Sequence, residues 1–79
     1  MRPEEIRELL RRQPFVPIRI HLMGGKTYDI THPEDFIVGR SRVDIGVGGD
    51  PAAGIVDHVE YVSLLHIVKI EDLAAAGKP

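Results

Sequence analysis

The stretch FVPIRIHLMGGKTYDIT, residues 15–31, carries the pattern that decides the fold. Apolar side chains occupy every second position on both sides of Gly24-Gly25, which is the period of a strand with one buried face. A pair of glycines can take the positive backbone dihedral angles that tight hairpin turns require. We therefore expect an antiparallel hairpin that turns its apolar side chains inward and leaves Arg19 and His21 facing outward.

Residues 3–12, PEEIRELLRR, are expected to form an amphipathic helix in front of this hairpin. Pro3 suits the first helical position, and Glu4 and Glu5 lie where the helix dipole favours negative charge. Pro14 ends the helix, because the residue before a proline is pushed out of helical dihedral angles. The chain is therefore expected to pass from the helix directly into the first strand.

The segment after the hairpin is expected to form a turn, a third strand and a long connection. The spacing of Thr31 and Glu34 predicts a capping box at the start of a short helical or tight turn. Residues 42–47 resume period-two alternation and predict the third strand. Residues 46–54 concentrate glycine and small residues, a composition typical of an exposed connection longer than a two-residue turn.

Two further strands are expected toward the C-terminal end. Residues 55–64 have the pattern of a strand that changes phase near Tyr61, which indicates a bulge or a strand buried on both faces. The spacing from Leu64 to His66 suits a short helical turn that leads into a final strand. Residues 73–79 have little to bury, which predicts a flexible tail.

Length and composition limit the class of protein. The chain has 79 residues, room for one domain, which we expect to span residues 1–79. Its net charge of −2 disfavours a protein that works mainly by neutralising phosphates. It has no cysteine, which excludes disulfides, thiolate catalysis and cysteine-based zinc sites. No long apolar run or basic-then-apolar leader is visible, so we expect a cytoplasmic protein without a membrane partner.

No constellation of residues in the sequence points to catalysis. The four histidines are not spaced two, three or four residues apart, so no pair is set to share one metal ion. A site that joins His21 or His58 to nearby carboxylates is the weaker alternative. The glycine-rich stretches lack the spacing of phosphate-binding loops, and Ser41 and Ser63 have no partner base placed by the sequence. We therefore expect no enzyme activity, no cofactor and no metal.

Cationic side chains on the predicted strands are the remaining candidates. Arg19, His21 and Lys26 belong to the hairpin, and Arg40 and Arg42 flank the third strand. If the helix packs across an open end of a small barrel, these side chains could share a surface for a phosphate backbone or an acidic protein partner. Alternatively, they pair with neighbouring acids as a mixed solvated surface. The acids outnumber lysine and arginine by 12 to 10, which favours this second interpretation.

The order of one helix and about five strands resembles the small Sm-like β-barrel, the architecture of the bacterial Sm-type RNA chaperone. The resemblance covers about residues 4–72 and implies RNA binding. The family's lysine-histidine pair would fall at residues 64–66, where His66 matches and the lysine does not. The runs RRQPFVPIRIHL, GGKTYDITHPE, VGRS and VSLLHIVKIE also resemble a set of short uncharacterised bacterial proteins, a resemblance that implies no activity.

These observations predict a mainly β (α+β) fold, with an N-terminal helix followed by about five antiparallel strands in a small Sm-like barrel over residues 15–72. Such a barrel leaves edge strands exposed, and a marginal core gains stability from association. We therefore expect a non-catalytic interaction module that forms a homo-oligomer through its strand edges. The alternative is RNA or single-stranded nucleic-acid binding through the arginines. The expected core consists of Leu9, Phe15, Ile18, Ile20, Leu22, Tyr28, Ile30, Val43, Ile45, Val62, Ile67 and Ile70.

Overall fold

The structure is a computed structural model that describes residues 1–73. It is mainly β, with one N-terminal helix and six strands. The helix and strands are α1 (Pro3–Leu10), β1 (Ile18–Leu22), β2 (Thr27–Ile30), β3 (Phe36–Val38), β4 (Arg42–Val47), β5 (His58–Ser63) and β6 (Ile67–Asp72). Short 3-10 helices lie between them: η1 (Pro33–Asp35), η2 (Pro51–Ala53) and η3 (Leu64–His66).

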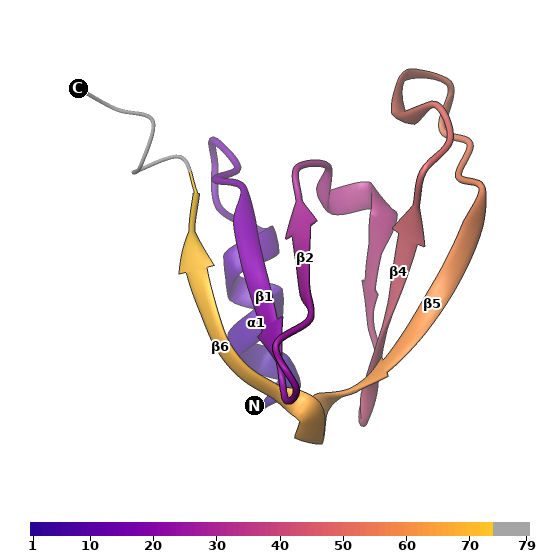
Figure 1. Cartoon of the computed structure of the whole chain (residues 1–79). Helices are drawn as coiled ribbons and strands as arrows, with labels where there is room; N and C mark the ends of the chain where they lie inside the picture. Colours follow the sequence, from indigo (N-terminus) through magenta and orange to yellow (C-terminus); the bar gives the residue numbers. More distant parts are fainter. Residues whose placement is uncertain (74–79) are drawn as a thin grey trace.

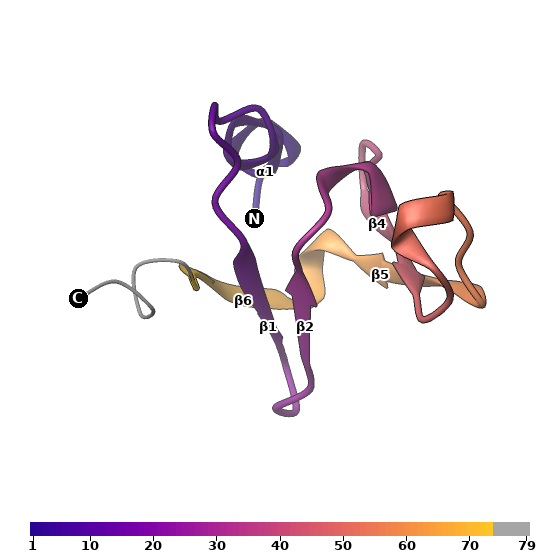
Figure 2. The ribbon, with the colours of Figure 1, turned by 90° about the horizontal axis from the view of Figure 1, so that it is seen from above.

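The strands form two antiparallel sheets of three strands each, with the orders β2-β1-β6 (sheet A) and β3-β4-β5 (sheet B). Figure 1 shows β6 and β5 at opposite sides of the molecule, with η3 joining them at the bottom of the view. Figure 2, from above, shows α1 on one side of the strands and the β1–β2 turn on the other. Within residues 1–73 no strand pairing joins the two sheets, so the strands do not close into a barrel.

The β1–β2 hairpin confirms the prediction from residues 15–31. Ile18 lies opposite Ile30 in the register, and both side chains are buried. Gly24 and Gly25 have φ angles of 90° and 98°, the left-handed region that glycine enters without a steric penalty. The turn chemistry therefore set the register, and the register put the apolar side chains on one face.

Aliphatic side chains from the helix and both sheets fill the core. All of the expected core residues are either buried or packed against the buried set. The prediction missed Ile6, Phe36 and Leu64 as members of the buried set. The buried side chains are Ile6, Ile18, Ile20, Ile30, Phe36, Val43, Ile45, Val62, Leu64 and Ile67.

Helix α1 is shorter than the expected range of residues 3–12. It ends at Leu10, and Arg11 forms its C-terminal cap. The side chain of Arg12 turns back, so that its Nε donates to the Leu9 carbonyl oxygen at 3.3 Å and its Nη2 to the Val16 carbonyl oxygen at 3.3 Å. Arg12 therefore fastens the helix end to the segment that leads into β1.

Two details of the predicted β2–β3 region are corrected. There are six strands instead of about five, because residues 36–38 form a short strand, β3, that was not expected. The short helical turn is present, but His32 precedes it and no side chain caps it. The Thr31 hydroxyl instead lies 3.0 Å from Nδ1 of His32, so the expected capping box between Thr31 and Glu34 does not form.

The predicted irregularity near Tyr61 is also corrected. β5 pairs with β4 in one continuous register, from Arg42↔Ser63 to Val47↔His58. The pattern changes phase because Glu60 lies opposite the buried Ile45, on the inner face. The register shift of the molecule lies instead between β1 and β6, at His21 and Leu22.

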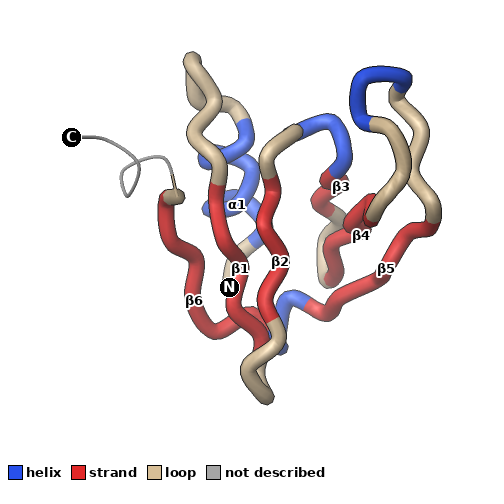
Figure 3. Tube along the Cα trace, turned by 45° about the horizontal axis from the view of Figure 1, so that its top comes forward, coloured by secondary structure: helices blue, strands red, loops and turns tan. Residues whose placement is uncertain are grey.

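The remaining predictions concern the connections and the C-terminal end. The turn from Leu64 to His66 is confirmed as η3, which leads directly into β6 and is drawn in blue between them in Figure 3. The connection expected at residues 46–54 runs instead over residues 48–57, because β4 extends to Val47 and β5 begins only at His58. An isolated bridge between Asp50 and Ile55 closes it. Of the predicted tail, Leu73 donates its amide to the Pro17 carbonyl oxygen at 2.8 Å, and residues 74–79 lie outside the described residues.

Candidate functional site

The outer face of sheet A carries Arg19 and His21, and both are paired. Arg19 lies opposite Asp29 and donates to its two carboxylate oxygens at 2.7 and 3.0 Å. Nε2 of His21 lies 2.7 Å from Oε1 of Glu71 on β6. Hydrogen bonds from these partners hold the pKa of Asp29 and of Glu71 below the usual carboxylate range.

Lys26 belongs to a polar network that links β2 to β5 across the two sheets. The Tyr28 hydroxyl donates to Oε1 of Glu60, and Nζ of Lys26 lies 3.3 Å from the same oxygen. His58 reaches the other oxygen of Glu60 at 3.0 Å. The hydrogen bond from Tyr28, followed by those from His58 and Lys26, lowers the pKa of Glu60 to about 2. This network connects the sheets where no backbone pairing does.

Arg40 and Arg42 lie at the start of sheet B and differ in their surroundings. Nε of Arg42 lies 3.0 Å from Oδ1 of Asp44, and its guanidinium carbon lies 4.2 Å from the centre of the Tyr61 ring. Arg40 forms no ion pair with any residue of the described chain. The five candidate residues are therefore spread over both sheets, and an intramolecular carboxylate lies beside each of them except Arg40.

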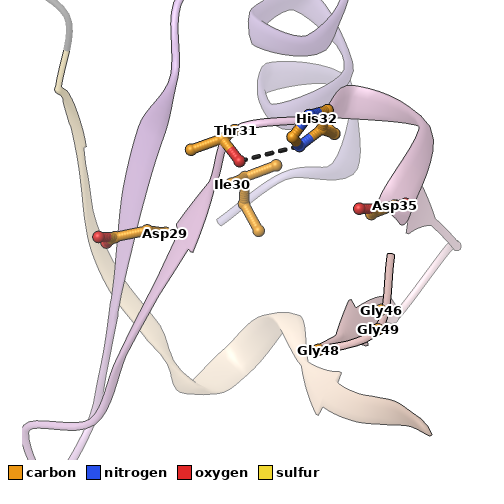
Figure 4. Close-up of a pocket in the computed structure, with 8 residues that line it drawn as sticks. All are labelled: Asp29, Ile30, Thr31, His32, Asp35, Gly46, Gly48 and Gly49. Carbon is orange, nitrogen blue, oxygen red and sulfur yellow. Dashed lines mark hydrogen bonds between the residues drawn. The ribbon is translucent and has the colours of Figure 1, made fainter. Parts of the chain in front are cut away.

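A hollow of about 240 Å³ lies between the end of β2 and the glycine-rich end of β4. In Figure 4 the side chain of Asp29 points away from the hollow, toward its partner Arg19. The Thr31 hydroxyl and Nδ1 of His32 lie 3.0 Å apart and point toward each other (Figure 4). They do not point toward one position inside the hollow. The polar side chains of this hollow thus do not converge as a nucleophile with a base or as a pair of acids would.

Residues 1–73 contain neither a cluster of metal ligands nor a helix that could span a membrane. No group of three or more histidine, aspartate and glutamate side chains is placed to hold a metal ion. No helix in these residues is both long enough and apolar enough to cross a lipid bilayer. The backbone carbonyl oxygen of Ser41 accepts the Leu64 amide, and the hydroxyl of Ser63 accepts the Leu65 amide.

The free edge of β5 is the first of two outer edges. The Leu64 amide donates to the Ser41 carbonyl oxygen at 3.0 Å. Backbone groups in an antiparallel ladder alternate between the two sides of a strand, so residues 60 and 62 face β4 while Val59 and Tyr61 face the open side. The side chains of Val59 and Tyr61 are 46% and 65% exposed. This edge thus combines free backbone groups with apolar side chains.

The free edge of β6 is the second outer edge. The Leu73 amide donates to the Pro17 carbonyl oxygen. By the same alternation, the backbone N–H and C=O groups of Glu71 and Lys69 face β1, while those of Ile70 face the open side. Val68, at the register shift, is 60% exposed. Leu65 in η3, between the two edges, is 83% exposed. A run of exposed apolar side chains therefore follows the chain from β5 through η3 into β6.

The sequence held a signal for these edges. The phase change near Tyr61 reflects two large apolar side chains, Val59 and Tyr61, on the outer face and one half-buried glutamate, Glu60, on the inner face. The distribution of the arginines had no comparable signal, because their partners depend on how the sheets and the helix pack.

In the comparisons with known proteins, no family model, no curated protein and no solved structure matches this chain.

Proposed function

We propose that this protein is a non-catalytic interaction module that self-associates by pairing the free edge of β5 in one copy with the free edge of β6 in the next. The observation that carries the proposal is the position of these edges. Both are edge strands of their sheets, as are β2 and β3, and β5 and β6 are the pair that lies at opposite sides of the molecule (Figure 1). Two different edges at opposite sides allow head-to-tail contacts, which generate rings when the rotation closes.

Exposed apolar side chains on both edges support the same proposal. A long apolar edge strand is a template for pairing with another chain, and monomeric proteins usually blunt such edges with charge or proline. On β5 the exposed side chains are Val59 and Tyr61, which lie on the outer face of the edge strand, and on β6 the exposed side chain is Val68. Burial of these side chains in a contact would add a hydrophobic contribution to the backbone hydrogen bonds.

As part of this proposal, we describe the fold more finely as an Sm-like barrel. If β2 and β3 are counted as one strand interrupted by η1, the chain has one helix followed by five strands. The strands then run in the single order β6-β1-β2-β3-β4-β5 around the core. The network of Tyr28, Lys26 and Glu60 supports this description, because it links β2 to β5 across the core side of both sheets.

Light scattering after size exclusion tests self-association, and two matched variants locate it. Tyr61 and Ile37 both lie opposite Asp44 on the outer face of sheet B and are 65% and 64% exposed. Tyr61 lies on the free edge of β5, whereas Ile37 lies on β3 at the other margin. We expect Tyr61→Lys to shift the protein toward the monomer and Ile37→Lys to leave the oligomer unchanged. A wild-type protein that is monomeric across the micromolar range, or equal effects of the two variants, would contradict the proposal.

Nucleic-acid binding through Arg19, His21, Lys26, Arg40 and Arg42 stays a prediction. Four of these five side chains lie beside intramolecular carboxylates, so phosphates would have to compete with partners already in place. A titration with single-stranded oligonucleotides at two salt concentrations tests it, since phosphate contacts weaken steeply as salt rises. The non-catalytic role and the cytoplasmic location are likewise proposals.

A further inference from the structure

A groove between helix α1 and the β3–β4 hairpin collects the arginines that have no intramolecular partner. The sequence has seven arginines. Arg7, Arg11 and Arg40 form no ion pair with any residue in 1–73, and all three line this groove. We call it the arginine groove and define it by Arg7, Arg11, Arg40, Leu10, Phe36 and Val38.

The arginine groove is formed by hollows that share their walls. A hollow of about 520 Å³ lies between α1 and β3, and Arg7 and Val38 also line the adjoining hollow of about 280 Å³. Arg40 lines that second hollow and a third of about 330 Å³ beside η3. The groove therefore runs along the length of α1 rather than forming an isolated dent.

The groove combines positive charge with an apolar floor. Phe36 is buried beneath it, and Leu10 and Val38 are half-buried along it. The lining holds the three unpaired arginines and the two carboxylates of Glu4 and Glu34. Arg2, which lines the third hollow, pairs with Glu5. The chain as a whole has a net charge of −2, so this excess of cations is local. Its complement is a ligand that carries both carboxylates and apolar side chains.

We propose that the arginine groove binds an extended acidic peptide in which glutamate or aspartate alternates with apolar residues. Arg7 lies in the last turn of α1 and Arg11, four residues later, caps it, which places them on one face about 6 Å apart along the helix axis. Side chains on one face of an extended peptide repeat every two residues, about 6.8 Å. Two alternate carboxylates thus match the two guanidinium groups, and the apolar side chains between them face the side of Phe36 and Val38.

A peptide fits the arginine groove better than a nucleic acid does. Bases of a single strand bind by stacking on aromatic rings, and the one aromatic side chain in the groove, Phe36, is only 4% exposed. Glu4 and Glu34 in the lining would repel a continuous phosphate backbone, whereas a peptide can place its acids beside the arginines alone. This inference does not depend on self-association, because the two hollows nearest Arg7 do not include β5 or β6.

Fluorescence anisotropy with a labelled peptide of alternating glutamate and valine tests the proposal. We expect saturable binding that Arg7→Gln/Arg11→Gln weakens by about tenfold or more, since charge-assisted bidentate pairs are lost. The control Arg19→Gln/Arg42→Gln removes the same charge elsewhere and is expected to leave the affinity within about twofold. Glutamine preserves helix propensity, and circular dichroism verifies that each variant is folded.

Two further probes distinguish the chemistry. The same peptide with glutamine in place of glutamate is expected not to bind, and an oligothymidine is expected to bind more weakly than the acidic peptide. The proposal is overturned if the acidic peptide does not bind, if both double variants weaken binding equally, if the glutamine peptide binds as well, or if the oligothymidine binds more tightly.

Discussion

Replacing Ile6 with alanine tests whether α1 is docked on the core, on which the arginine groove depends. Ile6 is the one fully buried side chain of the helix, with no exposed surface. The substitution removes three buried carbons, worth about 2.4 kcal/mol at about 0.8 kcal/mol each. The cavity left behind raises the expected loss to about 3 kcal/mol. This is a large part of the roughly 4–12 kcal/mol expected for a domain of this length.

Thermal unfolding followed by circular dichroism measures this loss. A loss of about 3 kcal/mol lowers the midpoint of a domain of this size by about 12–24 °C. Glu8→Ala is the matched control, because Glu8 is exposed on the same helix, and exposed substitutions change stability by about 0.5 kcal/mol or less. Equal midpoints for the two variants would refute the reasoning, since the helix would then contribute nothing to the core.

Two further predictions concern the sheets. The depressed pKa of Glu60 means that the folded state holds fewer protons than the unfolded state between pH 4.5 and about 2, so the free energy of unfolding falls as the pH drops through that window. We expect Glu60→Gln to flatten this dependence in urea titrations, and an unchanged slope would contradict it. Gly49→Ala is expected to destabilise the protein more than Gly54→Ala. Both positions have positive φ angles, +79° and +73°, but a Cβ at Gly49 would lie 2.6 Å from Cα of Val56, whereas that of Gly54 meets open space. Gly54→Ala then costs only about 1 kcal/mol, and equal losses in chemical unfolding would dismiss the steric explanation.

The local features of this fold could be predicted from its sequence. The hairpin follows from the Gly24-Gly25 turn and from alternation that continues on both sides of it. The same alternation predicts which face of each strand is buried, and this is why the expected core agrees with the observed one. Even the pair of Arg19 and Asp29 follows from the hairpin register once the turn is placed.

The features that depend on distant contacts could not be predicted. Period-two alternation assigns a face to a strand but not a partner. The turn at η1 could therefore be predicted, but not that the strands on either side of it belong to two separate sheets. The same limit applies to charge. Lys26 meets Glu60 and Arg12 meets Asp72 only because β2 and β5, and the helix end and β6, come together in the fold. The three unpaired arginines are recognised only after these pairs have been assigned.

Amide hydrogen exchange at high and low protein concentration tests the pairing of β5 with β6 most directly. By the alternation of an antiparallel ladder, the amides of Val59 and Tyr61 on β5 and of Ile70 on β6 face the open edges. We predict that these amides exchange slowly in concentrated solution and become fast on dilution, while the amides of β4 stay protected throughout. Fast exchange at Val59, Tyr61 and Ile70 at every concentration would contradict self-association through these edges.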